Sequence, residues 1–236
     1  MSHDRNATSI SNRFLDALPE PARRELGAEL RPVSLARDAV LYEARGRIEE
    51  VYFPAGAVIS SLMIMGNGDA IEVATVGNEG VVGHPAILRR ATSADKVIVQ
   101  VGGPGLRVEA RVLRELAAAG GPLRELIEGY DEVFRVQVSR SVGCNGLHQL
   151  EQRCCRWLLM THDRVASDDL KLSHEFLAVM IGCRRASVTT VLGPLQAAGL
   201  VRSLHGRIIV LDRAGLEGRA CECYGVVRDE YDRFYG

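Results

Sequence analysis

The sequence predicts an α+β protein with an N-terminal β-roll of jelly-roll type, a long central helix and a C-terminal helix-turn-helix followed by a hairpin. Three observations predict this fold. Short β-prone runs separated by turn residues fill residues 30–108. A helical pattern of about 20 residues, or close to 30 Å, follows Pro122. Residues 172–212 then contain two short helical patterns separated by Gly182-Cys183, and two β-prone runs joined by His205-Gly206.

The N-terminal part begins with residues 1–12, which lack an apolar segment, so we expect a flexible arm and no secretory signal. Two short helices broken at Pro19-Glu20-Pro21 are expected within residues 9–29. The pattern then becomes that of strands, and Asn67-Gly68 predicts a tight turn between two of them. The expected strands are 33–35, 39–42, 51–53, 58–65, 70–76, 97–101 and 106–108.

The central part contains a helix over 110–118, a break at Gly120-Gly121-Pro122, and the long helix. Its apolar residues recur at intervals of three and four, as in a heptad seam. The helix is longer than the small roll needs, so we expect it to form a parallel homodimer; a buried core helix is the alternative. A change of direction is expected at Asn145-Gly146. The expected dimer-interface residues are Leu123, Ile127, Tyr130, Phe134, Val138 and Ser141.

The C-terminal part begins with an amphipathic helix over 147–162, in which Trp157 is expected in the core. A short strand is expected around 170–172. Ser173 suits a helix N-cap because its hydroxyl can accept from a free backbone N–H of the first turn. A second helix, 185–198, presents apolar residues at i, i+3, i+4 and i+7 on one face. An amphipathic helix over 216–234 ends the chain, and the pattern leaves its packing partner open.

The charge pattern of this part points to nucleic acid. The whole chain has net charge −1, yet the window from Phe176 to Leu211 holds four arginines and no Asp or Glu. Neutralisation of phosphates supplies much of the sequence-independent affinity for DNA. Arg184 and Arg185 open the second helix, where the first residues of a recognition helix reach base edges. The alternative is a helical hairpin with a solvated arginine face.

This part resembles the winged helix-turn-helix of the CRP/FNR family of bacterial transcription regulators. The residues that carry the resemblance are Leu177-Ala178, Ile181-Gly182-Cys183, Arg185, Ser187-Val188, Leu192, Leu195, Gly199-Leu200 and His205-Gly206. The resemblance implies a homodimer that reads double-stranded DNA, with RNA polymerase as a further candidate partner. The residues expected to contact DNA are Ser173, His174, Glu175, Arg184, Arg185, Ala186, Ser187, Thr189, Thr190, Arg202, His205 and Arg207.

The recognition helix departs from the common family pattern. That pattern has Arg, then Glu, and a second Arg four residues after the Glu. Here the corresponding residues are Arg185, Ala186 and Thr190. Because the missing Glu removes an acceptor suited to cytosine N4, we expect a half-site different from the usual one.

The β-roll resembles the cyclic-nucleotide-binding domain of the same family, through 52–56, 76–80 and a mini-helix over 83–88. In nucleotide-binding members a Gly-Glu holds the ribose and an Arg followed by a small hydroxyl residue holds the phosphate. Here Gly83 is followed by His84-Pro85, and the Arg element is missing, so cyclic AMP or GMP is not expected. An unknown small-molecule effector remains an alternative, as does a receptor for a cyclic nucleotide or dinucleotide with an altered cassette. The candidate ligand-binding residues are Glu79, His84, Arg89 and Arg90, for which polar loop surface is the alternative.

Other functions find little support in the sequence. The six cysteines, including Cys154-Cys155 and the Cys-x-Cys at 221 and 223, do not have the spacing of a zinc or iron–sulfur site, so we expect no metal or cofactor. There is no phosphate loop and no paired nucleophile and base, so an enzyme is not expected. No apolar run of about 18 residues is present, so we expect no membrane span and a cytoplasmic protein. The expected domains are an arm (1–12), a β-roll sensor (13–121), a dimerisation helix (122–145) and a winged helix-turn-helix DNA-binding domain (146–236).

Overall fold

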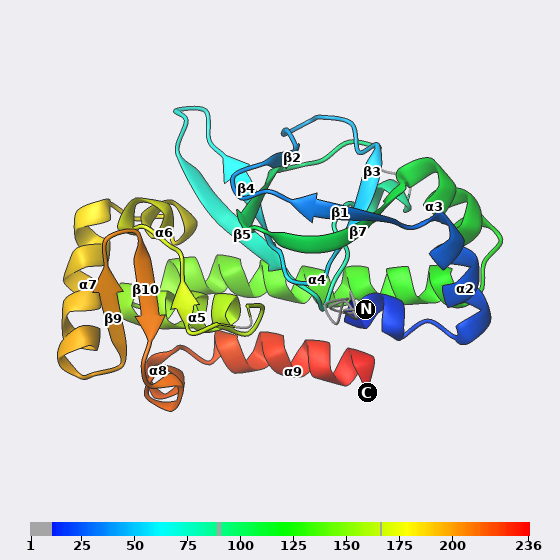
Figure 1. Cartoon of the computed structure of the whole chain (residues 1–236). Coiled ribbons are helices and arrows are strands. Elements are labelled where there is room, and N and C mark those ends of the chain that lie inside the picture. The colour runs from blue at the N-terminus through cyan, green and yellow to red at the C-terminus, as the bar shows by residue number, and fades with distance from the viewer. Residues whose placement is uncertain (1–10, 89–90, 166) are drawn as a thin grey trace, which may run out of the picture.

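The computed structural model describes residues 11–88, 91–165 and 167–236. The β-roll lies on one side of the long helix α4 (Pro122–Leu147) and the last helix, α9 (Cys223–Tyr235), lies on the other (Figure 1). The remaining C-terminal elements gather at the C-terminal end of α4. The predicted α+β fold is therefore confirmed, with a roll, a central helix and a helix-turn-helix with a wing.

The β-roll consists of two antiparallel sheets with the strand orders β1-β7-β3 and β2-β6-β4-β5. Each predicted β-prone run forms a strand, and Asn67-Gly68 lies at the turn between β4 and β5. Inward side chains such as Val51, Phe53, Ile59 and Val99 are fully buried between the sheets. The strands are β1 (Arg31–Leu35), β2 (Val40–Tyr42), β3 (Glu50–Pro54), β4 (Val58–Ile64), β5 (Ala70–Val76), β6 (Lys96–Val101) and β7 (Gly103–Glu109).

Short helices close one end of the roll. They are α1 (Arg13–Asp16), α2 (Glu20–Glu29), α3 (Ala110–Ala118) and the single turn η1 (His84–Ala86). Residues 1–10 of the expected arm are outside the described residues. Asn12, which we included in that arm, is instead buried: its side chain caps α1 and donates to the carbonyls of Pro54 and Gly80. Its two hydrogen bonds to the roll are long-range contacts that the hydropathy of residues 1–12 does not indicate.

The central helix α4 is longer than predicted, with 26 residues, and extends two residues beyond the expected boundary at Asn145-Gly146. The chain turns at His148-Gln149 instead, and α5 (Leu150–His162) begins there. A reciprocal capping box between Gln149 and Gln152 satisfies the backbone N–H groups at the start of α5 and so places the break. Gly143 and Gly146 are tolerated within the last turns of α4.

The C-terminal region contains a small antiparallel sheet, β8-β10-β9, beside the helix-turn-helix. The single terminal helix that we predicted is two helices, because Asp212 caps a short one with its side chain and residues 220–222 break the pattern. The second one, α9, packs along α4, where the ring of Phe234 lies over Gly129. The elements are β8 (Asp169–Leu170), α6 (His174–Met180), α7 (Arg185–Ala197), β9 (Val201–Leu204), β10 (Arg207–Val210) and α8 (Arg213–Arg219).

One continuous set of buried apolar side chains runs from the roll through α4 into the helix-turn-helix region. No single helix of the described residues is long and apolar enough to cross a membrane; α6 and α7 meet the criterion only as a pair bent by 104°, on length and composition alone.

Candidate DNA-binding site and effector cavity

The pair α6 and α7 has the geometry of a helix-turn-helix. The two helices meet at a bend of 104°, and residues 181–184 join them. Gly182 has φ +62°, a conformation that favours glycine, so the turn forms at low cost. The Ser173 hydroxyl accepts from the N–H of Phe176, as its predicted N-cap role requires. Leu177, Val188 and Leu192 hold the two helices together through their buried apolar faces.

His174 joins three elements of this site. Its Nδ1 lies 3.0 Å from the Thr189 hydroxyl on α7, and its Nε2 lies 2.7 Å from the Ser203 hydroxyl on β9. Burial, and then the charge of Arg185, lower the pKa of His174, which favours the neutral imidazole. Both ring nitrogens are occupied by hydroxyl partners, so His174 positions the recognition helix and the wing relative to α6.

The wing forms at the predicted place. Strands β9 and β10 pair antiparallel, and Gly206 in their turn has φ +74°. Gln196 near the end of α7 accepts from the backbone N–H of Ser203, at 2.7 Å, which ties the wing to the recognition helix. Arg207 on β10 forms an ion pair with Asp169 of β8 at 3.2 Å. The wing is therefore held on both sides by polar contacts.

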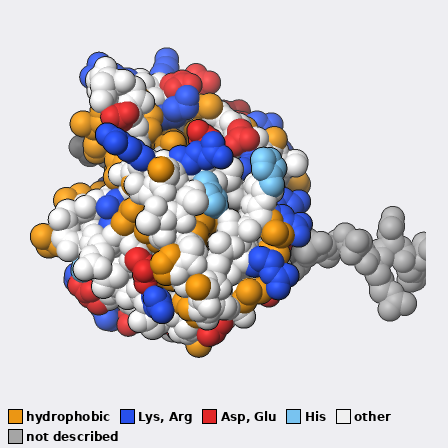
Figure 2. Space-filling model, turned by 90° about the vertical axis from the view of Figure 1, so that its left-hand side faces the viewer, with side chains coloured by type: hydrophobic (Ala, Val, Ile, Leu, Met, Phe, Trp, Pro, Cys, Tyr) orange, Lys and Arg blue, Asp and Glu red, His pale blue; other side chains and the backbone are white. Residues whose placement is uncertain are grey.

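The arginines of the acid-free window differ in their partners. Arg185 pairs with Glu175 at 3.3 Å, and both side chains are about 70% exposed. The acids that reach the window thus come from just outside it, Glu175 on α6 and Asp169 on β8. Arg184 and Arg202 are exposed, and their side chains have no hydrogen bond or ion pair to any described residue. Figure 2 faces this end of the molecule, where blue and pale-blue side chains lie among uncharged ones, with red ones mostly toward the margins.

The small residues of α7 are also on the surface. Ala186, Thr189 and Thr190 are exposed, and Ser187 is half-buried. The Thr190 hydroxyl donates to the Ala186 carbonyl at 3.1 Å, which leaves its methyl group and an oxygen lone pair facing outward. His205 is exposed at the tip of the wing. All twelve expected DNA contacts lie on α6, α7 or the wing, or immediately before α6 or α7; Ser173 and His174 serve first as structural contacts.

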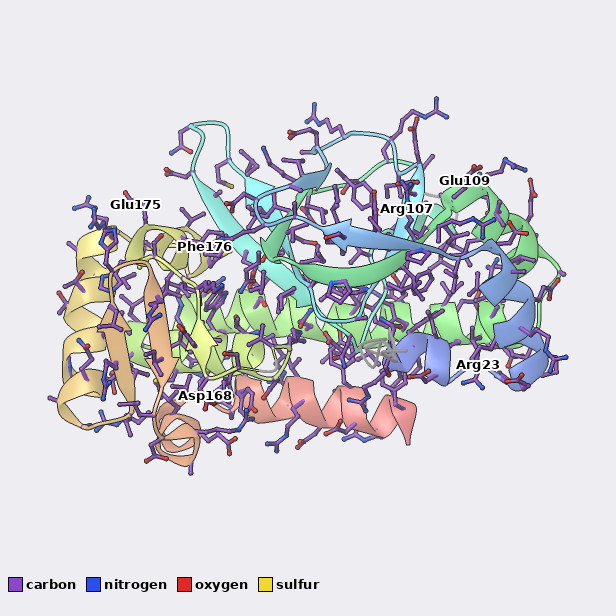
Figure 3. All side chains as sticks on the ribbon, in the orientation of Figure 1. Arg23, Arg107, Glu109, Asp168, Glu175 and Phe176 are labelled. Atoms are coloured by element: carbon purple, nitrogen blue, oxygen red, sulfur yellow. The ribbon has the colours of Figure 1, made fainter. Side chains whose placement is uncertain are left out.

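The helix-turn-helix also touches the roll. Phe176 lies on the side of α6 toward β4 and β5, whereas Glu175 is directed outward (Figure 3). The Arg37 guanidinium lies 5.9 Å from the centre of the Phe176 ring, and the Trp157 indole N–H donates to Glu72 of β5 at 2.9 Å. Burial raises the pKa of Glu72 to about 7. Trp157, which we expected simply in the core, is therefore also a polar contact between the two regions.

A cavity of about 430 Å³ lies between the roll and α4. His84 forms part of its wall and contacts Asp131 of α4, with Nε2 3.2 Å from Oδ1. This hydrogen bond lowers the pKa of Asp131. Arg135 pairs with the second oxygen of Asp131 at 3.3 Å. The cavity wall is otherwise largely apolar, with Tyr42, Ile48, Val76, Val81, Val97, Phe134 and Val138 among its residues. Asp131 and Arg135 escaped the sequence-based reasoning because no local motif marks them.

Glu79, a second expected ligand residue, does not line this cavity. Glu79 is buried in an ion pair with Arg164 of the loop after α5, at 2.7 Å, with both side chains less than 10% exposed. It also accepts from the N–H of Gly77. Glu79 therefore ties the roll to the C-terminal region, because a buried carboxylate needs a cationic partner. Arg89 and Arg90 lie outside the described residues.

The expected dimer residues fall on two different surfaces of α4. Leu123, Ile127, Tyr130 and Ser141 are buried inside the protomer. Their heptad spacing reflects packing of α4 between the roll and α9, which a sequence pattern cannot distinguish from packing against another chain. Phe134 and Val138 are only partly buried, and Val142, one turn further on, is 69% exposed. These three side chains form an apolar stripe along α4.

Part of the C-terminal region is similar to known proteins. Residues 152–219 match the Crp-like helix-turn-helix domain. A stretch of 58 residues is 38% identical to the transcriptional regulator SdrP of Thermus thermophilus, and this match covers 25% of the chain and 29% of SdrP. The chain thus spans less than a third of that relative in the alignment.

Solved structures agree over most of the chain. A protein from Eubacterium rectale described as a transcriptional regulator of the crp/fnr family superposes with TM-score 0.69 and 15% identity, covering 87% of this chain and 96% of that one. TTHB099 of Thermus thermophilus, a transcriptional regulator of the CRP family, gives TM-score 0.65 and 20% identity, covering 80% and 96%. At these identities the likeness establishes the fold. The matched segment is similar to a Crp-like helix-turn-helix domain. The fold is that of solved structures described as regulators of the crp/fnr family.

Proposed function

We propose that the protein is a homodimeric regulator of transcription that reads a palindromic DNA site with α7. The observation that carries the proposal is the exposed start of α7, where Arg184 and Arg185 stand beside small hydroxyl residues on a helix held by His174 and the wing. Arg pairs bidentately with guanine, and Thr suits a thymine methyl or a phosphate. This supports double-stranded DNA as the partner and argues against a merely solvated arginine face.

A dimer follows from the same geometry. Two half-sites about one helical turn apart are read by two recognition helices related by two-fold symmetry. The apolar stripe Phe134, Val138 and Val142 is the surface that we assign to the contact between copies. In this proposal 13–121 is the sensor, 122–145 the core of the dimerisation helix and 146–236 the DNA-binding part, in a protein of the cytoplasm. An activator of this kind would also contact RNA polymerase.

Selection from a pool of randomised duplexes, with the purified full chain, tests the proposal. We expect enrichment of a palindrome whose half-sites are about 10 base pairs apart, centre to centre. Fluorescence anisotropy should then give affinity for that site at least about a thousandfold above a shuffled duplex at physiological salt. Binding that is steep in salt but equal for all duplexes would contradict sequence-specific recognition.

A second candidate role concerns the cavity between the roll and α4. We infer that it receives a small-molecule effector with an apolar body and a group that hydrogen-bonds to the His84–Asp131 pair. An effector that binds one arrangement of α4 more tightly would shift the spacing of the two recognition helices. The alternative effector is a cyclic nucleotide or dinucleotide.

Calorimetry against cyclic mononucleotides and dinucleotides separates these alternatives. Because Asp131 already pairs with Arg135, the cavity offers little excess positive charge among its described residues, and we expect no heat from either class. Binding that is weakened by Val138→Trp, which fills the cavity, would instead favour the nucleotide receptor.

A further inference from the structure

Three cysteine thiols and one histidine imidazole from distant parts of the chain lie close together at the C-terminal end of α4. Cys144 lies in the last turn of α4 and His148 follows that helix, while Cys221 and Cys223 flank the start of α9. One ligand atom from each of the four lies within 4.8 Å of all the others. Cys144 and His148 are separated from Cys221 and Cys223 by more than 70 residues in the sequence, so spacing rules based on nearby cysteines could not find the site.

The distances are close to those of a tetrahedral metal site. Four ligands at the Zn–S distance of about 2.3 Å lie about 3.8 Å from one another. Here the sulfur atoms of Cys144 and Cys221 are 3.5 Å apart, and Nδ1 of His148 is 3.7 Å from the sulfur of Cys223. The other distances between ligand atoms are at most 4.8 Å, so small side-chain movements would bring all four atoms to tetrahedral spacing around one ion. The donor set, three thiols and one imidazole, is typical of structural zinc.

The histidine is oriented as a ligand. Nε2 of His148 lies 3.1 Å from a carboxylate oxygen of Glu222, which favours a proton on that nitrogen. Nδ1 is then the unprotonated nitrogen and faces the thiols. A carboxylate behind the metal-binding histidine is a common feature of zinc sites because it fixes the tautomer and raises the basicity of the ligand.

The surroundings suit an anionic cluster. The three cysteines are buried, and they form an apolar cluster separate from the main core. Arg156 is 7% exposed, makes no ion pair with any described residue, and leaves its Nε without a hydrogen-bond partner. It lies beside the C-terminal part of α4, where it donates to the hydroxyl of Ser141, three residues before Cys144, at 3.2 Å. Three thiolates and Zn²⁺ carry a net charge of −1, which this buried guanidinium would offset.

We propose that Cys144, His148, Cys221 and Cys223 bind one zinc ion that joins the C-terminal end of α4 to the segment between α8 and α9. The bound ion links the helix that carries the sensor to the end of the DNA-binding region, across the break where α5 begins. Binding requires loss of the thiol protons, so it releases protons and becomes tighter as pH rises. The proposal does not depend on DNA recognition.

The rival arrangement is a redox-active pair, Cys144 and Cys221. Formation of that disulfide needs an oxidant to accept two electrons, and it gives no role to His148, Glu222 or Cys223. The zinc site uses all five side chains. The two arrangements differ in metal content and in the number of free thiols.

Metal analysis of the full chain, purified with reductant and without chelator, tests the proposal. We expect about one zinc per chain, and Co²⁺ exchange should give the sulfur-to-metal charge-transfer and visible bands of a tetrahedral thiolate site. Cys221→Ser and Cys223→Ser should lose both signals. Cys183→Ser is the matched control, because Cys183 lies in the turn between α6 and α7, and it should keep them.

Glu222→Gln retains all four proposed ligands, so it tests the site even if the cysteine variants fail to fold. It should keep the native circular dichroism and bind zinc roughly tenfold more weakly, as measured by competition with a chromophoric chelator. Zinc at background in the reduced wild-type chain, or zinc that persists unchanged in Cys221→Ser, would overturn the proposal. Loss of two titratable thiols in air, restored by reductant and without bound metal, would replace it with the disulfide.

Discussion

At the scale of single residues, the site is organised by hydrogen bonds that hold in place the groups that we propose to contact DNA. His174 bridges Thr189 on α7 and Ser203 on the wing, and Gln196 adds a second tie to the wing. The charged side chains are less constrained, because Arg184 is unpaired among the described residues and Arg185 has one exposed partner. In the proposed complex, the neutral side chains would therefore fix the position of α7 and the wing, and the arginines would supply the affinity for DNA.

Replacement of Arg185 by Ala tests base reading. If the guanidinium pairs with guanine, R185A should cost about 1–3 kcal/mol of binding to the selected site and relax base choice at one position in each half-site. Repeated duplex selection with the variant measures both. Equal weakening on all duplexes, with a smaller salt slope, would make Arg185 a phosphate contact.

Replacement of Glu175 by Gln should strengthen DNA binding. The exposed pair of Glu175 with Arg185 contributes at most about 1 kcal/mol, and DNA must compete with it. Releasing Arg185 and removing a negative charge near phosphates should raise affinity about two- to fivefold at low salt. Anisotropy titrations measure this, with Glu230→Gln on α9 as the control for loss of one acidic partner. Weaker binding in Glu175→Gln would show that the carboxylate itself contacts a base.

At the scale of elements, α4 has two different apolar surfaces. One is the buried face that packs between the roll and α9, with Ile127 and Tyr130 at its centre. The other is the narrower stripe of Phe134, Val138 and Val142, which also borders the cavity through its first two residues. A ligand in the cavity would therefore act directly on the side chains that we assign to the dimer.

A charge on this stripe should separate the copies. Val142 is 69% exposed, so V142D removes little packing within the protomer but places a carboxylate in the proposed interface. We expect a shift from dimer to monomer in light scattering, and weaker binding to the palindrome. Val40→Asp, on an exposed apolar residue of β2, is the matched control. A dimer that survives in V142D would place the contact elsewhere.

At the scale of the whole molecule, several polar contacts connect the roll to the C-terminal region, and three of these join side chains already described. They are the Glu79–Arg164 ion pair, the Trp157–Glu72 hydrogen bond and the stacking of Arg37 on Phe176. Among these groups, Glu72 is a carboxyl whose pKa is raised by burial from 4.5 to about 7. The packing of the roll against the C-terminal region should therefore change with pH near neutrality.

Stability should fall as pH rises through this range. The unfolded carboxyl loses its proton near pH 4.5, whereas folded Glu72 keeps it until about pH 7. The contribution of neutral Glu72 is thus complete below pH 4.5 and lost progressively up to about pH 7, on the order of 3 kcal/mol in all. Urea unfolding of Glu72→Gln should lack this loss, whereas Glu125→Gln on α4 should keep it. Parallel pH profiles of Glu72→Gln and wild type would contradict the shift.

Much of the fold could be predicted because its signals are local. Alternating residues and turn pairs such as Asn67-Gly68 gave every strand of the roll, and Ser173 and Gly182 marked a cap and a turn that the structure confirms. Predictions from local sequence signals failed where contacts between distant residues determine the structure. Asn12 is ordered by hydrogen bonds to the roll, and α4 continues past Asn145-Gly146 until the capping box of α5.

By itself the sequence determined the order of elements, the helix-turn-helix with its wing, and the acid-free arginine window, because periodicity, capping and charge are properties of short segments. Only the tertiary structure decided which face of α4 is buried, that Glu79 pairs with Arg164, and that His84 meets Asp131. It alone brought Cys144 and His148 to Cys221 and Cys223. Each of these depends on which distant surfaces pack together, and the hydrophobic effect that drives packing is non-directional, so no local pattern specifies the partner.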